Sequence, residues 1–343
     1  MRALVYQGPK QMTIEQWPVP EPKAGEVRVR SRFVGICGSD VHGFLGTTGR
    51  RTAPMVMGHE MSGVVSAVGE GVTTVQVGDR VTVQPILNCG VCDYCKDGLI
   101  NICPDREFLG AMSCNGAFAD EFCVPEKNIC KLPDSVSLEV GALIEPFAVA
   151  YRGVRHAGDI TGKTVMICGA GTIGLMVLKV CRMLGAGTIV MVDLRNERLA
   201  LAARHGADVC INGREDIGAV LTEKGLRRSI DVAIEAVGVS PTVQQTVDFV
   251  KNRGQVIWIG NNAPMVSLNM QNVVTREVRI QGSYVYTQED FETCIRLLAE
   301  TPQDFTGIIS ASISLEETAA MFETLSSGAG AIIKVLVDLE QDA

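Results

Sequence analysis

The pattern of hydrophobic and polar positions divides the chain into a strand-rich first part and a second part in which strands and helices alternate. Residues 1–150 hold short segments rich in β-branched residues between clusters of Pro and Gly, and no helix longer than about two or three turns is predicted there. The expected strands are Ala3–Tyr6, Met12–Gln16, Val27–Phe33, Gly63–Val68 and Arg80–Gln84. This part is therefore predicted to be mainly β-structure.

Residues 151–285 alternate apolar strands with helices, which predicts a parallel, doubly wound sheet. The expected strands are Thr164–Cys168, Thr188–Val192, Val209–Ile211, Asp231–Glu235, Gln255–Ile259 and Val278–Gly282. Helices are expected between several of them, at Leu175–Leu184, Glu197–His205 and Thr242–Asn252. The remaining residues predict helices near Asp290–Ala299 and Leu315–Leu325 and a last strand at Ala331–Leu339. We expect that strand to join a sheet of the first part.

Length and composition narrow the class of protein. The chain of 343 residues exceeds the roughly 250–300 that a single core supports, so two domains are expected. A net charge of −8 and an aromatic content of 5% argue against a nucleic-acid partner. The longest weakly polar run, Thr164–Leu178, is shorter than the about 20 residues of a membrane span. Since the first residues lack the pattern of a signal peptide, we expect a cytoplasmic protein without a membrane partner.

A glycine-rich loop after the strand at 164–168 points to a dinucleotide. The sequence Gly169-Ala170-Gly171-Thr172-Ile173-Gly174 fits G-x-G-x-x-G, in which a tight turn leads a helix N-terminus to a pyrophosphate. Asp193 follows about 20 residues later, where an acid accepts hydrogen bonds from the adenosine ribose. This favours NAD over NADP. Arg195 and Arg198 leave NADP open, and Arg198 could instead stack on the adenine. The alternative is a glycine turn in an unrelated α/β sheet.

Four of the twelve cysteines form a compact cluster in a loop-like segment near residues 86–110. Their spacing, C-x2-C-x2-C-x7-C, allows four thiolates to surround one tetrahedral ion and leaves no open coordination position. This is typical of structural zinc, although an iron–sulfur cluster uses the same ligands and chance spacing is a third possibility. The cysteines are Cys89, Cys92, Cys95 and Cys103.

A second set of residues fits a metal site with an open position. Cys37 ends a predicted strand, and His59 follows in a Gly-His-Glu motif. A catalytic zinc takes three protein ligands and a water or substrate, so a carboxylate must complete the set. Glu60 and Glu145 are both candidates, because Glu145 is an acid within an apolar stretch and requires a partner there. The alternative is an inert cysteine and a core histidine.

Together, these motifs resemble the zinc-dependent medium-chain alcohol dehydrogenase superfamily over essentially the whole chain. The matching positions are Gly58–Gly63, Gly69, Val72, Gly78 and Asp79. The segments Ile36–His42 and Ile144–Pro146 are most similar to the sorbitol (polyol) and threonine dehydrogenase branch. In simple alcohol dehydrogenases a cysteine stands at the position of Glu145.

The resemblance implies an α/β protein of two domains. Residues 1–150 and 286–343 would form a GroES-like β-barrel catalytic domain, with a structural-zinc lobe near 86–110. Residues 151–285 would form a Rossmann domain with a doubly wound parallel sheet that binds NAD, and the catalytic cleft would lie between the domains. By this analogy the four cysteines hold zinc rather than an iron–sulfur cluster, which gives two zinc ions per chain. Relatives are dimers or tetramers, so a homo-oligomer is expected.

The implied reaction is the reversible transfer of a hydride to NAD from a secondary alcohol, in a polyol or sugar-derived alcohol, which yields a ketone. Zinc would bind the substrate oxygen as a Lewis acid and lower the pKa of the hydroxyl. Ser39 would take the proton, and His42 would pass it to solvent. Glu60 and Glu145 would bind zinc in turn or hold its water.

Asp40 is expected to orient His59, and its alternative role is that of a turn or cap residue. Sorbitol dehydrogenases have an aromatic residue after the first His and an Arg-Tyr pair after the last strand of the nucleotide domain. Here those positions are Gly43 and Val285-Tyr286, so sorbitol itself is not the expected substrate. Tyr286 either contacts the substrate or packs in the cleft wall.

Two other functions stay open on the sequence. The same residues would serve an L-threonine or 2,3-butanediol dehydrogenase, which a panel of small-molecule alcohols distinguishes. A catalytically silent NAD-binding sensor would retain the fold alone, although such a protein would be expected to have lost Cys37, His59 or Glu145.

Overall fold

The long strand β3 (Glu26–Ile36) is the centre of the largest sheet. In the computed structural model, which describes residues 1–328 and 332–341, buried Val27 and Val29 alternate with the more exposed Arg28 and Arg30 along this strand. Side chains of a strand point to opposite faces in turn, so this alternation gives β3 one apolar face. β3 pairs antiparallel with three strands, and its last residues lead to one of the candidate metal sites.

The first and last segments of the chain fold together as one compact unit, which comprises Met1–Glu145 and Thr287–Ala343. Its seven-stranded sheet has the order β10-β6-β5-β3-β18-β17, with β9 also on β3. The strands are β5 (Glu60–Val68), β6 (Arg80–Val83), β9 (Glu121–Pro125), β10 (Ile129–Lys131), β17 (Ile309–Ile313) and β18 (Lys334–Asp338). A second sheet has the order β2-β1-β4, from β1 (Arg2–Gly8), β2 (Gln11–Gln16) and β4 (Met55–Val56).

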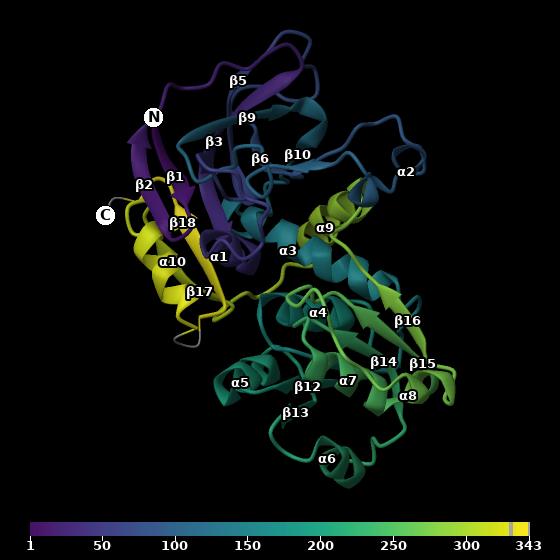
Figure 1. The fold of residues 1–343 in the computed structure, drawn as a ribbon. Coiled ribbons are helices and arrows are strands. Elements are labelled where there is room, and N and C mark those ends of the chain that lie inside the picture. The colour runs from purple at the N-terminus through teal and green to yellow at the C-terminus, as the bar shows by residue number, and fades with distance from the viewer. Residues whose placement is uncertain (329–331, 342–343) are drawn as a thin grey trace. The chain divides into compact units, whose positions relative to one another are not determined.

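The prediction that the last strand joins the first part is confirmed. β18 lies antiparallel to β3, with Val335 opposite Ile36, and its yellow ribbon lies among the purple N-terminal strands in Figure 1. The C-terminal helix α10 (Thr318–Ser326) packs on α1 (Gly38–Phe44), and the rings of Phe44 and Phe322 lie 5.5 Å apart. Residue 331, the first of the predicted strand, lies outside the described residues.

The prediction that residues 1–150 hold no helix beyond about three turns is wrong. Helix α3 (Leu138–Arg155) has 18 residues, with Pro146 inside it. Residues 141–148 are all buried, so the sequence shows a continuous apolar run without the stripe of an amphipathic helix, and proline usually marks a helix break. The expected domain boundary at 150/151 falls within this helix, five residues after the boundary between the compact units at Glu145 and Pro146.

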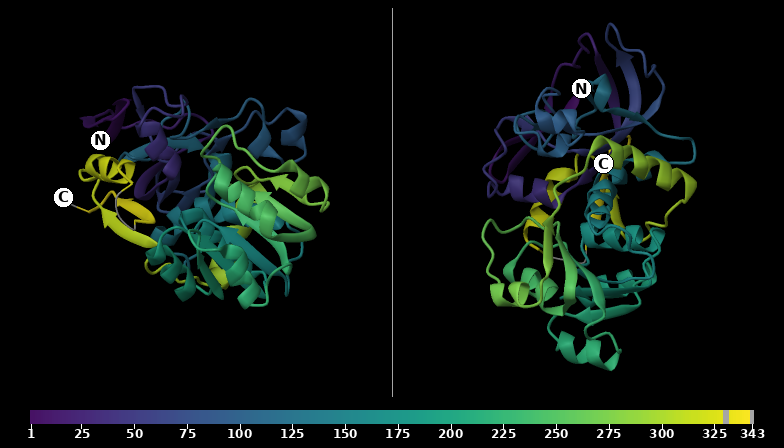
Figure 2. Two further views of the ribbon diagram at one scale, coloured as in Figure 1. Left: turned by 60° about the horizontal axis from the view of Figure 1, so that its bottom comes forward. Right: turned by 90° about the vertical axis from the view of Figure 1, so that its right-hand side faces the viewer.

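The second unit, Pro146–Tyr286, is built on a six-stranded sheet in which every neighbouring pair of strands is parallel. The strand order is β13-β12-β11-β14-β15-β16, and all six predicted strands are confirmed. This is the order of a doubly wound dinucleotide-binding sheet, and Figure 2 shows its teal-to-green strands side by side. The strands are β11 (Thr164–Cys168), β12 (Thr188–Asp193), β13 (Val209–Asn212), β14 (Ile230–Glu235), β15 (Val250–Trp258) and β16 (Arg279–Gly282).

The helices of the second unit follow the predicted alternation with one difference. They are α4 (Thr172–Met183), α5 (Asn196–Arg204), α6 (Ile217–Glu223), α7 (Ser240–Phe249) and α8 (Met270–Val274). The helix expected at 242–252 ends at Phe249, because Val250 already pairs with Ile230 as the first residue of β15. Among the described residues, no helix has the length and apolarity that crossing a membrane requires.

Candidate functional site

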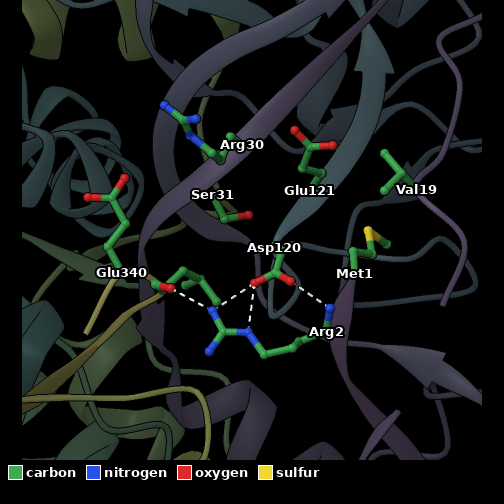
Figure 3. Close-up of a pocket in the computed structure, with 9 residues that line it drawn as sticks. Met1, Arg2, Val19, Arg30, Ser31, Asp120, Glu121 and Glu340 are labelled. Carbon is green, nitrogen blue, oxygen red and sulfur yellow. Dashed lines mark hydrogen bonds and ion pairs between the residues drawn. The ribbon is translucent and has the colours of Figure 1, made fainter. Parts of the chain in front are cut away.

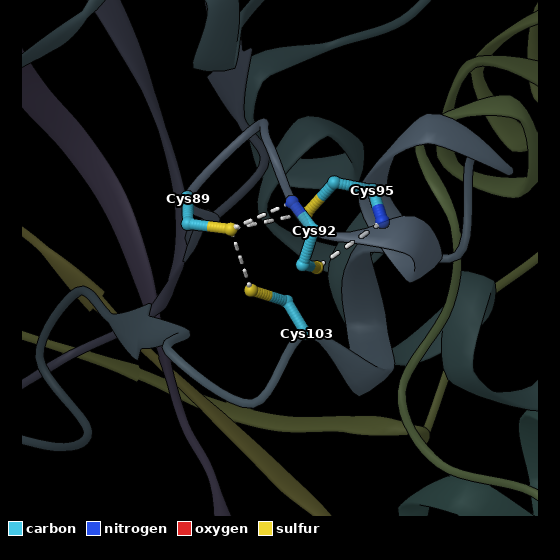
Figure 4. Close-up of side chains that lie close together, drawn as sticks. All are labelled: Cys89, Cys92, Cys95 and Cys103. Atoms are coloured by element: carbon cyan, nitrogen blue, oxygen red, sulfur yellow. Dashed lines mark hydrogen bonds between the residues drawn. The ribbon is translucent and has the colours of Figure 1, made fainter.

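The four predicted cysteine ligands converge in the loop between β7 (Ile86–Leu87) and β8 (Glu107–Phe108) (Figure 4). The Sγ atom of Cys89 lies 3.5 Å from that of Cys103 and 3.9 Å from that of Cys95. All four Sγ atoms lie within 4.8 Å of one another. Four thiolates at about 2.3 Å from a tetrahedral zinc would be about 3.8 Å apart, so this cluster fits a structural zinc.

Backbone N–H groups hold the sulfur atoms in place. The N–H groups of Cys92 and Cys95 donate to the Sγ atoms of Cys89 and Cys92, respectively, each at 3.4 Å. Hydrogen bonds from the N–H groups of Val91 and Cys92 lower the pKa of Cys89 to about 6. These N–H groups therefore favour the thiolate of Cys89, the form of cysteine that binds a metal.

Cys37, His59 and Glu60 form the second group, and their ligand atoms also lie within 4.8 Å of one another. Cys37 follows β3 and is the N-cap of α1, whereas Glu60 is the first residue of β5. The pairing of β3 with β5 places Gly35 opposite Glu60. A Cβ atom at Gly35 would lie 2.0 Å from the Glu60 carboxylate, so only glycine leaves room for that side chain. A thiolate, an imidazole and a carboxylate are a ligand set that fits catalytic zinc.

Asp40 lies beside the ring of His59, the residue that it is expected to orient. Asp40 is completely buried, and its Oδ1 atom lies 3.3 Å from Nδ1 of His59. Burial raises the pKa of Asp40, but the charges of His59 and Arg51 and the N–H of Cys37 lower it below its usual value overall. Burial likewise lowers the pKa of His59, and the negative Asp40 and Cys37 raise it well above its usual value. With Nδ1 facing a carboxylate, Nε2 is the atom of His59 left for a metal.

Lys334 is a member of this site that the sequence analysis missed. Its Nζ atom donates to both carboxylate oxygens of Glu60, at 2.8 and 2.6 Å, and to the carbonyl of Ile36 at 2.9 Å. Burial lowers the pKa of Lys334, but the negative charges of Glu60, Cys37 and Glu145 raise it above its usual value overall. A lysine at the head of an otherwise apolar strand was the available signal, because a buried cation requires an anionic partner.

The two candidate carboxylates differ in position. Glu60 belongs to the group with Cys37 and His59, whereas Glu145 does not. Glu145 is 5% exposed in helix α3, and its charge acts on Lys334, which places it near the same site. Glu60 is therefore the carboxylate that the structure groups with the other two ligands.

The other predicted residues of the reaction lie in different surroundings. Ser39 and His42 are in helix α1, directly after Cys37, and both are exposed. Tyr286 is fully buried and is the last residue of the second unit. This burial agrees with a packing role for Tyr286. Contact between Tyr286 and a substrate stays a prediction.

The predicted nucleotide loop joins β11 to the N-terminus of α4. A Cβ atom at Gly174 would lie 1.7 Å from the carbonyl oxygen of Gly169, so the helix can approach the loop only with glycine there. Gly169 itself has a φ of 103°, which favours glycine. Thr172 and Ile173 form the first turn of α4, whose free N–H groups suit a phosphate.

Two charged residues border this loop. The carboxylate of Asp193 accepts hydrogen bonds from the N–H groups of Ala170 at 2.7 Å and Arg195 at 2.9 Å. The guanidinium of Arg198 lies 3.8 Å from the place of a Cβ atom at Gly171, and burial lowers its pKa. Both predicted residues are thus next to the glycine loop.

A separate pocket of about 350 Å³ lies beside the N-terminus (Figure 3). Arg2 donates to Asp120 and to the carbonyl of Leu339 in this pocket, and Arg30, Glu121 and Glu340 also line it. None of its lining residues belongs to the two cysteine-containing groups. Within the first unit, the Arg2–Asp120 pair joins β1 to the residue that precedes β9.

Comparison with known proteins agrees with this geometry. Residues 23–134 match the alcohol dehydrogenase GroES-like domain, and residues 172–300 match the zinc-binding dehydrogenase domain. A probable D-xylulose reductase A from Aspergillus terreus is 34% identical over 98% of this chain and 97% of that protein.

Solved structures extend the comparison. Galactitol-1-phosphate dehydrogenase from Escherichia coli is 30% identical with a TM-score of 0.91, over 98% of this chain and 100% of that chain. An alcohol dehydrogenase from Escherichia coli CFT073, solved with NADH, is 30% identical with a TM-score of 0.92, over 99% of both chains.

The doubly wound sheet, the glycine loop and the two metal-ligating groups define a zinc-dependent, nicotinamide-linked oxidoreductase. The chain belongs to the zinc-dependent medium-chain alcohol dehydrogenases, in their polyol branch. It is a nicotinamide-linked dehydrogenase that acts on CH–OH groups of small molecules, and zinc is a further cofactor.

Proposed function

We propose that this dehydrogenase oxidises a secondary alcohol group in a sugar-derived polyol, reversibly, and that Cys37, His59 and Glu60 hold its catalytic zinc. The observation that carries the proposal is the group formed by these three side chains, whose ligand atoms lie within 4.8 Å of one another. When bound, zinc supplies the Lewis acidity that lowers the pKa of the substrate hydroxyl, and NAD accepts the hydride.

The chain's own residues handle the proton and the charge. Ser39 receives the substrate proton, and His42, exposed in the same helix, passes it to solvent. Lys334 balances part of the negative charge of Cys37, Glu60 and Glu145. Glu145 serves as the second carboxylate, which holds water at the site or exchanges with Glu60 as a ligand.

We also propose a preference for NAD over NADP. Both carboxylate oxygens of Asp193 accept backbone N–H groups, which fixes the charge at the end of β12 next to the glycine loop. A negative charge there favours ribose hydroxyl groups and repels a 2′-phosphate. Gly169 and Gly171 would let the backbone approach the pyrophosphate beside the first turn of α4, and Gly174 lets that helix pack against the loop.

The substrate class is tested with a panel of alcohols. NADH formation by the zinc-loaded protein is measured with pentitols, hexitols, galactitol 1-phosphate, aldonates, L-threonine and 2,3-butanediol, each with NAD and with NADP. The expected result is the highest kcat/KM for a polyol or sugar alcohol with NAD. A higher kcat/KM for L-threonine or 2,3-butanediol would refute the assignment of a polyol as the substrate. Binding of NADH without any turnover would point instead to a sensor.

We further propose a homodimer or homotetramer in the cytoplasm. Among the described residues no strand pairs with the outer side of β16, and Met265, Met270 and Val274, which are nearby in sequence, are 84%, 70% and 63% exposed. An exposed sheet edge with apolar neighbours suits pairing between identical chains. None of the twelve cysteines forms a disulfide bond, which suits a reducing compartment. Sedimentation velocity would show a single species of two or four chains, whereas a monomer at micromolar concentration would refute the assembly.

A further inference from the structure

Gly43, one of the two positions that depart from sorbitol dehydrogenases, makes space for a buried arginine. A Cβ atom at Gly43 would lie 2.9 Å from both Cγ and Nε of Arg51. These atoms belong to the middle of the Arg51 side chain, so a larger residue at 43 would displace the whole side chain. The Arg51 side chain is only 4% exposed. The chain therefore uses the space beside α1 for a guanidinium.

The guanidinium of Arg51 connects the turn that carries Cys37 to a second segment of the chain. Its Nη2 atom donates to Oδ1 of Asp40 at 3.0 Å and to the carbonyl of Ser39 at 3.3 Å. Its Nη1 atom donates to the carbonyl of Ala111. The planar fork of arginine can contact these three acceptors at once, which an ammonium group on a flexible stem does not do equally well.

Asp40 is the link between Arg51 and the metal ligands. Its Oδ1 atom faces both Nη2 of Arg51 and Nδ1 of His59, at 3.0 and 3.3 Å, and its Oδ2 atom accepts the N–H of Cys37 at 3.2 Å. A fully buried carboxylate with several donors has one well-defined orientation. Oδ1 lies within ion-pair distance of Nδ1 of His59, so a ring that binds a metal through Nε2 would keep Nδ1 toward this carboxylate.

We propose that Arg51 is a positioning residue of the zinc site, which holds Asp40 so that His59 presents Nε2 to the metal, and that Gly43 is required for this placement. The proposal rests on the proposed zinc ligation by Cys37, His59 and Glu60. Arg51 acts through Asp40 and does not contact the metal or substrate. Removal of residues that orient metal ligands typically weakens metal binding or activity by about 10–100-fold.

The test uses Arg51→Met, Arg51→Lys and Gly43→Ala, with Arg50→Met as a control for the loss of one positive charge at the exposed neighbouring position. Cobalt is loaded at the proposed catalytic site while zinc stays in the four-cysteine site. The visible spectrum of the cobalt and its rate of release to a chelator are measured, followed by kcat and KM for the best alcohol.

We expect Arg51→Met to release cobalt about 10–100-fold faster than the wild type, with an altered spectrum. Arg51→Lys should retain the contact with Asp40 but lose some of the other hydrogen bonds of the guanidinium, so its rate of cobalt release should be intermediate. Arg50→Met should behave as the wild type. In the reaction, Arg51→Met should lower kcat more than it raises KM, because the substrate does not contact Arg51.

Gly43→Ala gives the sharpest outcome. Alanine has a higher helix propensity than glycine, so helix α1 should gain intrinsic stability. The substitution should nevertheless displace Arg51 and therefore speed cobalt release, as Arg51→Met does. The double variant Gly43→Ala/Arg51→Met should be no worse than Arg51→Met alone, since neighbouring residues that act through one contact are not additive.

Cobalt release and a spectrum unchanged from the wild type in Arg51→Met and Arg51→Lys would overturn the proposal. If Arg51→Met does not fold, Arg51→Lys and Gly43→Ala decide it by the same readouts. Cobalt release needs no alcohol, so a failure of the substrate assignment and a failure of this inference give different results.

Discussion

The ion pair between Lys334 and Glu60 permits a quantitative test of how the metal site is built. The two side chains are 2% and 1% exposed, and Nζ lies 2.6 Å from Oε2. Lys334→Met would leave the Glu60 carboxylate buried without its cation. Removal of one partner from a buried pair costs about 3–5 kcal/mol. Since a folded domain is stable by only about 5–15 kcal/mol, the first unit of Lys334→Met should unfold at a clearly lower urea concentration.

Bound zinc should reduce the loss of stability that Lys334→Met causes. A divalent cation bound by Cys37, His59 and Glu60 would supply the positive charge that the variant lacks. Zinc should therefore stabilise Lys334→Met more than the wild type and should dissociate from it more slowly. Turnover should fall, because the Glu60 carboxylate would lose the cation that holds both of its oxygens in position.

The assay is urea unfolding of the metal-free and zinc-loaded protein. The chain has two tryptophans, Trp17 in the first unit and Trp258 in the second, so a Trp258→Phe background makes fluorescence report on the first unit. Lys131→Met is the matched control, because Lys131 is in the same sheet but 52% exposed where it pairs with Asp79. Lys131→Met should lower the free energy of unfolding by less than about 1 kcal/mol.

A loss below about 1 kcal/mol in metal-free Lys334→Met would refute this reasoning, because it would place the cost in the range of an exposed pair. The double variant Lys334→Met/Glu60→Gln should regain part of the loss, since it removes the buried charge as well as its partner. No recovery in the double variant would mean that Lys334 acts through its contact with the carbonyl of Ile36.

Three other predictions concern separate parts of the chain. Cys37→Ala should abolish turnover while the affinity for NADH, measured by fluorescence titration, stays within about 2-fold of the wild type, because the glycine loop belongs to the other unit; loss of NADH binding in the folded variant would contradict this. Cys92→Ser should reduce the metal content from two zinc ions per chain to one, and two ions in this variant would exclude Cys92 as a required ligand. Burial raises the pKa of Asp231, but hydrogen bonds from Lys251 and Thr164 lower it below its usual value overall. This ionised carboxylate therefore stabilises the fold above about pH 4, and the contribution is lost as pH falls through the folded pKa. The advantage of the wild type over Asp231→Asn in urea should shrink below about pH 4, and a constant difference would contradict this.

The centre of the nucleotide-binding sheet could be predicted from the sequence because β11, β12 and β14 are almost entirely buried and are nearly continuous apolar runs. The glycine loop could also be predicted, since the close approach of Gly174 to Gly169 tolerates no side chain. Helix α3 was missed because the same continuous burial hides the period of a helix. Apolar runs thus identify burial more reliably than they identify the type of element.

The candidate site was only partly predictable for a different reason. Cys37 and His59 are in motifs that the sequence shows directly. Lys334 meets Glu60 only because β18 returns to β3, and Arg51 meets Asp40 only because Gly43 leaves space for it. Such contacts depend on the tertiary fold and have no local pattern. The same holds for the choice between the two carboxylates as the third ligand.

The most direct test of the whole account is the dependence of turnover on zinc. NADH formation from the best polyol of the panel is measured while zinc is returned to chelator-treated protein that has kept its four-cysteine site filled. The account predicts no activity without added zinc and full recovery at one further ion per chain, with no recovery in Cys37→Ala. Full activity before zinc is added, or equal activity in Cys37→Ala, would contradict it.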